Sequence, residues 1–353
     1  MALLWAVLMR RVLQPVLLAR RNVLLLSGVS LLATLALTLT PELGLSRGGS
    51  TPPSPPTPAS AAKPSPALAL LPTDAGLPRQ GDGRHYPLLP GDEKALATLL
   101  ASLEEAIRDP STPEADLPQL AHQQQVIYRV LAHRRPLADQ VRAALPQRWH
   151  PVFDHHVAAR REFLAMHRGP RRLMLPSWRI IPPKPPEQLL GYYREAAAAT
   201  GIPWEVLAAV NLVETGMGRV DGISVAGAQG PMQFLPSTWA EPGIGQGDIR
   251  NPRDAIGAAA RYLVRRGGPA NIKQALWGYN NSDHYGTAVL HYAALMKEDP
   301  AAFRGLYHWE VHFASGAGDL WLPVGYLQPQ PISVAAYLKT HPASAPPPGS
   351  SGY

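Results

Sequence analysis

Proline is distributed along this 353-residue chain in a way that rules out one uninterrupted globular fold. Eleven of the 39 prolines lie between residues 51 and 90, among serine, threonine and alanine residues. Proline fixes its own φ angle and carries no amide hydrogen, so such a stretch is extended and semi-rigid. We therefore predict a proline-rich linker over residues 46–91. A shorter proline-rich connector is expected over residues 169–186, and a disordered tail over residues 341–353.

The N-terminal 45 residues contain an apolar run of the kind found in membrane anchors and export signals. The run extends from Val23 to Leu39, and basic side chains precede it at Arg10, Arg11, Arg20 and Arg21. At about 1.5 Å per residue in a helix it spans roughly 25 Å, close to the thickness of a bilayer core. The arginines favour a cytoplasmic N-terminus, with everything after residue 45 outside. Residues 1–45 are thus predicted to be a signal anchor or a cleaved signal peptide, and the length of the run favours the anchor.

The charge and the cysteine content exclude several classes of function. The chain has no cysteine, which excludes disulfides, thiolate metal sites, a cysteine nucleophile and a lipidated N-terminal cysteine. Its net charge of +7 comes mainly from arginines that are scattered along the sequence. Because no single face is loaded with positive charge, we do not expect nucleic-acid binding. The basic balance instead suits an anionic envelope or membrane surface.

Two helical regions follow the linker, and they predict a mainly α-helical protein. Over residues 92–168, apolar side chains recur at helical spacing after a plausible N-cap, Asp92 (Leu96, Leu99, Leu100, Leu103, Ile107). We interpret His155 and His156 in this helical module as part of a solvated helix face, since no convergent metal ligands accompany them. The second region, residues 187–340, is predicted to be a helical domain that ends in a β-hairpin, because apolar residues alternate over residues 307–313 before a glycine turn.

One carboxylate occupies a position suited to acid catalysis. Residues 204–214 form a strongly apolar helical pattern that ends at Thr215 and Gly216, and glycine is common just past a helix end. Apolar neighbours, burial and the negative end of the helix dipole would each raise the pKa of Glu214. A carboxylic acid that stays protonated near neutral pH is what a general acid for glycosidic bond cleavage needs. From the helix pattern alone, a solvated glutamate on the last turn remains the alternative.

Small and polar residues that follow Glu214 in the sequence favour the catalytic acid over the solvated glutamate. They are Ser224, Gly227, Ala228, Gly230, Met232 and Gln233, followed later by Tyr279 and Asn280. In this order and near this spacing, they resemble the catalytic motifs of lytic transglycosylases with a lysozyme-like domain, over about residues 187–300. Two positions depart from the family pattern: Thr215 stands where serine is usual, and Pro231 where leucine is usual. The distance from Glu214 to Ser224 is also one residue longer.

The resemblance implies an enzyme that cleaves peptidoglycan. Glu214 would protonate the oxygen between N-acetylmuramic acid and N-acetylglucosamine, and would then act as base on the sugar's 6-hydroxyl to close a 1,6-anhydro ring. The substrate's own acetamido oxygen would stabilise the anomeric carbon, so the resemblance implies no metal and no organic cofactor. The residues expected to bind substrate or support the site are Thr215, Ser224, Met232, Gln233, Tyr279 and Asn280.

The same resemblance implies a place in the cell and a set of partners. We expect peptidoglycan glycan strands as the main partner, the membrane as a second through the N-terminal segment, and envelope proteins as candidate partners. The expected location is the cell envelope, on the periplasmic or extracytoplasmic side of the inner membrane, with the protein either anchored or secreted.

Two other functions stay open at this point. A lysozyme on the same fold would add water and needs a general base, for which Asp221 and Asp248 are the candidates. A non-catalytic module would bind glycan or scaffold an envelope machine, but it has no use for a buried acid. Trp239, Trp277 and Tyr285 either stack on sugar rings or pack in the core.

Overall fold

The computed structural model describes residues 63–166 and 171–350 of the chain. The predicted anchor or signal segment, residues 1–45, lies outside these ranges. Residues 46–62 of the predicted linker also lie outside them. Within the described ranges, no helix combines the length and the apolar character needed to cross a membrane. The contacts of the described residues place them in one unit.

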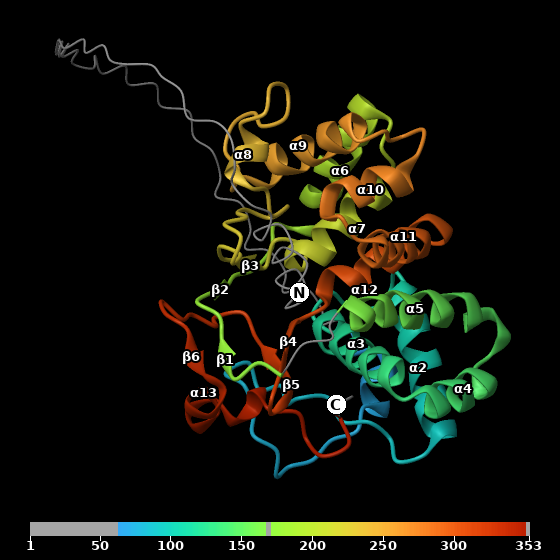
Figure 1. The fold of residues 1–353 in the computed structure, drawn as a ribbon. Coiled ribbons are helices and arrows are strands. Elements are labelled where there is room, and N and C mark those ends of the chain that lie inside the picture. Colours follow the sequence, from blue (N-terminus) through green and yellow to red (C-terminus); the bar gives the residue numbers. More distant parts are fainter. Residues whose placement is uncertain (1–62, 167–170, 351–353) are drawn as a thin grey trace, which may run out of the picture. The chain divides into compact units, whose positions relative to one another are not determined.

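The first helical region contains α2 (Glu93–Arg108), α3 (Leu117–His133), α4 (Arg135–Ala144) and α5 (His150–Met166), with the short 3-10 helix η3 (Gln147–Trp149) before α5 (Figure 1). Asp92 caps α2 as predicted: its carboxylate accepts a 2.8 Å hydrogen bond from the backbone N–H of Ala95. The predicted apolar stripe of α2 faces the core, and α2 packs against α3 and α4.

The segment from residue 63 to the start of α2 is not the extended linker that was predicted. It contains a 3-10 helix, η2 (Pro66–Leu70), and it buries Ala67, Leu71 and Tyr86. The Tyr86 hydroxyl donates a 2.7 Å hydrogen bond to the backbone carbonyl of Asp319, and Arg84 pairs with Glu310 at 2.8 Å. A proline-rich stretch forms few backbone hydrogen bonds of its own, but its apolar and aromatic side chains still pack on a neighbouring surface.

The second helical region supplies the helices that position the candidate site. They are α6 (Pro186–Thr200), α7 (Trp204–Thr215), α8 (Pro236–Trp239), α9 (Pro252–Arg265), α10 (Ile272–Asn280), α11 (Asp283–Glu298) and α12 (Ala302–His308). Helix α7 is buried from Val206 to Thr215, as expected for a helix that is apolar on all sides. Helices α6 and α9 pack together, and α11 lies against both α7 and α5 (Figure 1).

A β-hairpin follows these helices, as predicted. Strand β4 (Val311–Ser315) pairs with β5 (Gly318–Leu322), and Phe313 lies opposite Leu320. The alternating pattern was expected to begin at residue 307, but Tyr307 belongs to α12. Helix α12 packs against α2 and α3, and this contact explains why its apolar residues are helical rather than extended.

Two further strand pairs and a short helix complete the C-terminal part. Strand β1 (Met174–Leu175) pairs with β6 (Ile332–Ser333), and β2 (Arg179–Ile180) pairs with β3 (Val220–Asp221), so the predicted connector of residues 169–186 contributes strands. After α13 (Val334–Thr340), the 3-10 helix η4 (Pro342–Ser344) buries Ser344. The predicted disordered tail therefore differs from the structure over residues 341–350, which contact the rest of the fold.

One hydrophobic core joins the two helical regions. It includes Leu100 and Leu131 from the first region and Leu207 and Leu263 from the second. His156 on α5 is 2% exposed, and its ring stacks on Tyr128, so the interpretation of a solvated face is wrong for this residue. The fold is mainly α-helical with a C-terminal hairpin, as predicted, and the first helical region packs directly on the helices of the second.

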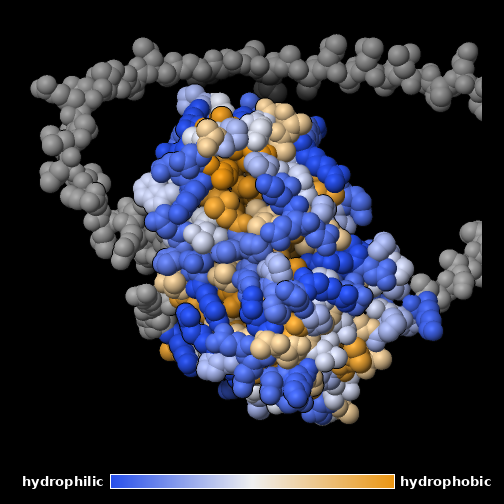
Figure 2. All heavy atoms as spheres, turned by 90° about the vertical axis from the view of Figure 1, so that its right-hand side faces the viewer, coloured by the Kyte–Doolittle hydropathy of each residue, from blue (hydrophilic) through white to orange (hydrophobic). Residues whose placement is uncertain are grey.

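Polar and apolar side chains are unevenly distributed over one face of the molecule. Figure 2 shows the side on which α10 and α11 lie in Figure 1. Apolar side chains gather in a hollow in the upper half of this face, at the height of the second helical region, and polar side chains cover most of the surface around them.

Candidate active site

Glu214 lies in the last turn of α7, where the helix ends in a left-handed residue. Gly216 has φ +61° and forms the C-cap, a conformation that glycine adopts without steric strain. The Glu214 side chain is 4% exposed, and its Oε1 accepts a 2.7 Å hydrogen bond from the hydroxyl of Tyr285. Its Oε2 is buried and has no hydrogen-bond partner among the described residues. One carboxylate oxygen is thus fixed, and the other is free to exchange a proton.

Burial controls the protonation of this carboxylate. It raises the pKa of Glu214 to about 8, while the hydrogen bond from Tyr285 acts in the opposite direction. The charged form loses its hydration in an apolar site and receives only one compensating hydrogen bond, so the neutral form is favoured. A carboxyl with a pKa near 8 is protonated at neutral pH and can donate that proton to a leaving group.

Tyr285 is the functional residue that sequence reasoning identified least well. It follows the N-cap Ser282 of α11, is fully buried, and touches the acid rather than a solvent-facing groove. Its ring lies parallel to that of Tyr279, with the centroids 6.3 Å apart. In the sequence, Tyr285 is only one of three aromatic residues that stack on sugar or pack in the core. Its distance of 71 residues from Glu214 leaves no local signal of their contact.

The segment after β3 forms a tight, glycine-dependent loop. The Ser224 hydroxyl oxygen accepts a 2.9 Å hydrogen bond from the backbone N–H of Ala228, which closes the turn around Gly227 (φ +84°). Gly230 has φ +73°, and a Cβ there would lie 1.9 Å from the carbonyl oxygen of Ile249. The small residues of the motif are therefore required by the backbone path.

Gln233 also adopts an uncommon backbone conformation, with φ +50°. Its Nε2 donates a 3.0 Å hydrogen bond to the carbonyl of Gly230, and it also reaches the carbonyl of Gly222 at 3.4 Å. Non-glycine residues with positive φ are uncommon and concentrate at functional sites. The Gln233 side chain is half-buried and holds the loop that passes the site.

Thr215, predicted as a site residue, is fully buried and secures this loop to α7. Its hydroxyl donates a 2.6 Å hydrogen bond to the carbonyl oxygen of Pro231 and accepts one from the N–H of Gly218 at 3.0 Å. Asn211, one turn earlier on α7, donates to the same carbonyl at 2.8 Å and accepts from the Tyr193 hydroxyl at 2.6 Å. These bonds fix the loop relative to the helix that carries Glu214, so Thr215 supports the site from behind.

Met232 and two residues from the end of α10, Tyr279 and Asn280, are the remaining predicted site residues. Met232 is fully buried, and its carbonyl accepts a 2.8 Å hydrogen bond from the hydroxyl of Tyr279. Asn280 ends α10, and its Oδ1 is buried without a partner among the described residues. Tyr279 thus connects the loop at Met232 to Tyr285, and through it to Glu214.

The remaining candidates from the sequence fall into separate environments. The rings of Trp239 and Phe234 pack in a T-shaped arrangement, whereas Trp277 is 43% exposed on α10. Asp221 pairs with both Arg179 and Arg250, and Asp248 accepts a 2.9 Å hydrogen bond from the backbone N–H of Arg250. Within the described ranges, no group of three or more histidines and carboxylates could hold a metal ion.

Comparison with known proteins supports an assignment for this part of the chain. Residues 191–290 match the family model of the transglycosylase SLT domain. This stretch contains Glu214, Tyr285 and the six other predicted site residues. No curated protein and no solved structure matches the chain. The match supports a lytic transglycosylase with a lysozyme-like fold, which acts on peptidoglycan in the cell envelope.

Proposed function

We propose that this chain cleaves the bond between N-acetylmuramic acid and N-acetylglucosamine in peptidoglycan and releases a 1,6-anhydro product, with Glu214 as both acid and base. The observation that carries this proposal is the state of Glu214: buried, with a pKa raised to about 8, and held at one oxygen by Tyr285. Such a carboxyl is neutral before the reaction and becomes charged during it.

In the first step, Glu214 acts as general acid. It transfers its proton to the glycosidic oxygen while the bond from that oxygen to C1 of N-acetylmuramic acid breaks. The acetamido oxygen of the same sugar attacks C1 and spreads the positive charge, which is the substrate-assisted route. The Tyr285 hydroxyl donates to Oε1 throughout and stabilises the carboxylate as it forms.

In the second step, the ionised Glu214 acts as general base. It removes the proton from the 6-hydroxyl of N-acetylmuramic acid, and the oxygen attacks C1 as the acetamido oxygen leaves. The 1,6-anhydro ring closes, Glu214 is protonated again by the proton of the 6-hydroxyl, and no water is consumed. A single buried carboxyl with a raised pKa serves both steps.

The alternative of a hydrolase is less favoured by the charges around the site. A second carboxylate would have to activate water as a base. Asp221 forms ion pairs with two arginines, and Asp248 accepts a hydrogen bond from a backbone N–H in an exposed loop turn. The two arginines compete with a water for the Asp221 carboxylate, and the Asp248 side chain is exposed rather than held in a buried site.

The position of the enzyme in the cell follows from its substrate and from its N-terminal segment. Since peptidoglycan lies outside the cytoplasmic membrane, we infer that residues 1–45 export or anchor the chain and that the folded part works on the extracytoplasmic side. We further propose that Ser224, Gln233 and Asn280 contact the bound sugar, because they lie with Glu214 in the stretch that matches the transglycosylase SLT domain.

Isotope labelling separates the two reactions. Peptidoglycan is digested by the full-length chain in water enriched in ¹⁸O, and the released muropeptides are weighed. Ring closure by the 6-hydroxyl incorporates no label, whereas hydrolysis adds one labelled oxygen to each new reducing end. Labelled products would overturn the proposal and establish a lysozyme.

A further inference from the structure

Arg219 is a buried cation that follows Glu214 closely in the sequence. The residue is 6% exposed, and its Nη1 donates a 3.0 Å hydrogen bond to the carbonyl oxygen of Gly216, the C-cap of α7. Carbonyl groups at the end of a helix lack partners within the helix and form the negative end of its dipole, so a cation suits this position. Burying an arginine costs free energy unless its partners compensate the charge. The partners of Arg219 therefore indicate why it is there.

Two of the groups that attract the Arg219 side chain lie outside residues 191–290, the stretch that matches the transglycosylase SLT domain. The guanidinium lies over the ring of Tyr307 on α12, 5.3 Å from the ring centroid. The Tyr307 hydroxyl donates a 3.0 Å hydrogen bond to the carbonyl of Lys184, in the connector before α6. Burial lowers the pKa of Arg219, and the negative charge of Glu310 acts in the opposite direction. A guanidinium stays charged in a protein, so these groups compensate a full positive charge.

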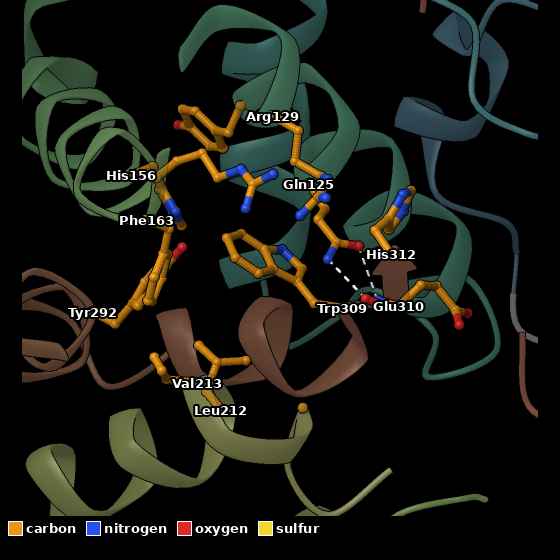
Figure 3. A pocket seen from close by; sticks show the side chains of 13 residues that line it. Gln125, Arg129, His156, Phe163, Leu212, Val213, Tyr292, Trp309, Glu310 and His312 are labelled. Carbon is orange, nitrogen blue, oxygen red and sulfur yellow. Dashed lines mark hydrogen bonds between the residues drawn. The ribbon is translucent and has the colours of Figure 1, made fainter. Parts of the chain in front are cut away.

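Glu310 is itself held by the first helical region. Its backbone N–H and C=O form two 2.9 Å hydrogen bonds with the side-chain amide of Gln125 on α3, drawn as dashed lines in Figure 3. Its Oε1 pairs with Arg84 at 2.8 Å. Glu310 also lines the same small cavity as Gly216, with a volume of about 60 Å³. The carboxylate that attracts Arg219 is thus fixed by α3 and by the segment before α2.

The backbone of Arg219 is fixed by a strand that also precedes the matched stretch. The Arg219 carbonyl accepts a 2.9 Å hydrogen bond from the N–H of Ile181. The next residue, Val220, pairs with Ile180 in the ladder of β2 and β3. Both the backbone and the guanidinium of Arg219 are therefore held by segments that lie outside residues 191–290.

We propose that Arg219 is a positioning residue for Glu214, and that the segments outside residues 191–290 keep it in place. By binding the Gly216 carbonyl, Arg219 fixes the C-terminal end of α7. Glu214 lies in the last turn of that helix, so its carboxyl keeps its place against Tyr285. This inference rests on the proposed function of Glu214, and it gives the first helical region and α12 a part in catalysis. The alternative is that Arg219 only stabilises the fold.

The first test compares two substitutions of Arg219 in the full-length chain. Initial rates on peptidoglycan are divided by the folded fraction, which unfolding curves give for each variant. Arg219→Met removes the charge and the donors, so we expect kcat to fall about 10- to 100-fold, the loss for one hydrogen bond to a charged group. KM should stay within about twofold, because Arg219 acts on the helix that carries the acid rather than on the sugar. Arg219→Lys keeps a charged donor and should recover kcat to within about fivefold of the wild type.

Arg108→Met is the matched control for a loss of stability alone. Arg108 on α2 is also largely buried, pairs with Glu104 and Asp299, and lies over a ring, that of Trp149, at 5.2 Å. Its replacement should lower the unfolding temperature and leave kcat per folded molecule unchanged. A wild-type kcat in Arg219→Met, or an equal fall in the two methionine variants, would overturn the inference.

A second pair of variants tests the support from outside the matched stretch, and it does not depend on the folding of Arg219→Met. Tyr307→Leu removes the ring beneath the guanidinium and should lower kcat about threefold or more. Tyr307→Phe keeps the ring and should behave like the wild type. Equal rates in these two variants would contradict the support from α12. Because Glu214→Gln tests the acid separately, each of these failures would leave the proposed function of Glu214 intact.

Discussion

The hydroxyl of Tyr285 donates a 2.7 Å hydrogen bond to Oε1 of Glu214, and both side chains are buried where α11 crosses the C-terminal end of α7. In the proposed mechanism this contact joins the two helices, since α7 would provide the acid and α11 the group that stabilises its charged form. Helix α11 in turn lies along α5, so the first helical region supports the helix that carries Tyr285.

The pH dependence of activity follows from the protonation of Glu214. We expect cleavage to fall as the pH rises through about 8, because the carboxyl then loses the proton that it must donate. Rates measured on peptidoglycan between pH 5 and 10 test this. A rate that begins to fall near pH 4 to 5, the ordinary range of a glutamate, would contradict the account.

The free energy of unfolding should also depend on pH, because Glu214 has different pKa values in the folded and unfolded states. The folded-state pKa of Glu214 is raised from 4.5 to about 8, so between these values the folded state binds more protons than the unfolded state. The stabilising contribution of Glu214 to the free energy of unfolding is therefore fully present below pH 4.5 and is lost as the pH rises through 8. The total loss is on the order of 5 kcal/mol. Denaturant titrations at pH 5, 7 and 9 should show a smaller loss for Glu214→Gln than for wild type.

Replacing Tyr285 by Phe tests the partner of the acid. We expect kcat to fall about 10- to 100-fold, because the forming carboxylate loses its hydrogen bond, and the alkaline limb of the pH profile should move to higher pH. Tyr279→Phe is the matched control. It removes the bond to the Met232 carbonyl and leaves the bond to Glu214 intact, so its pH profile should match that of the wild type. Identical shifts in the two variants would argue against a specific role for Tyr285.

Alanine substitutions of two glycines in the loop from Ser224 to Gln233 distinguish the cost of backbone strain from the cost of a steric clash. Gly230→Ala places a methyl group 1.9 Å from the carbonyl oxygen of Ile249, so we expect a loss of about 3 kcal/mol or more of unfolding free energy and of most activity. Gly227→Ala has a similar positive φ but meets no atom within 4 Å, and should lose only about 1 kcal/mol. Chemical denaturation and cleavage assays of both variants decide whether the close approach to Ile249 matters.

A buried ion pair connects the C-terminal hairpin to the first helical region. Arg129 on α3 forms two hydrogen bonds to the carboxylate of Asp319 on β5, and both residues are largely buried. Asp319→Asn leaves a buried arginine without its counter-charge, and we expect it to destabilise the fold by about 3–5 kcal/mol. Asp154→Asn breaks the exposed pair with Arg142 and should have little measurable effect. Similar unfolding midpoints for the two variants would show that the hairpin is not held by this pair.

The features that depend on local sequence were predicted well. The N-cap at Asp92, the apolar helix that ends at Glu214 and the hairpin after residue 310 all follow from periodicity and from turn residues close in the chain. The raised pKa of Glu214 also follows from its place at the end of an apolar helix. The order of small residues from Ser224 to Gln233 carried the resemblance to the catalytic motifs, and the structure explains part of it through the positive φ angles of Gly230 and Gln233.

What sequence reasoning missed depends on contacts between distant segments. Tyr285 reaches Glu214 across 71 residues, and Asn211 becomes important only when Pro231 folds back onto α7. Residues 63–91 have the composition of a linker, yet Tyr86 packs on a hairpin that lies more than 220 residues later. His156 was interpreted as solvated because no convergent metal ligands accompany it, but its ring lies against those of Trp309 and Tyr128.

The mass of the muropeptides released by wild type and by Glu214→Gln tests the central claim most directly. The account predicts wild-type products that are one water lighter than hydrolytic products, and no cleavage by a Glu214→Gln variant whose fold is unchanged. Products with free reducing ends, or the same anhydro products from the variant, would contradict the assignment of Glu214 as the acid and base of a lytic transglycosylase.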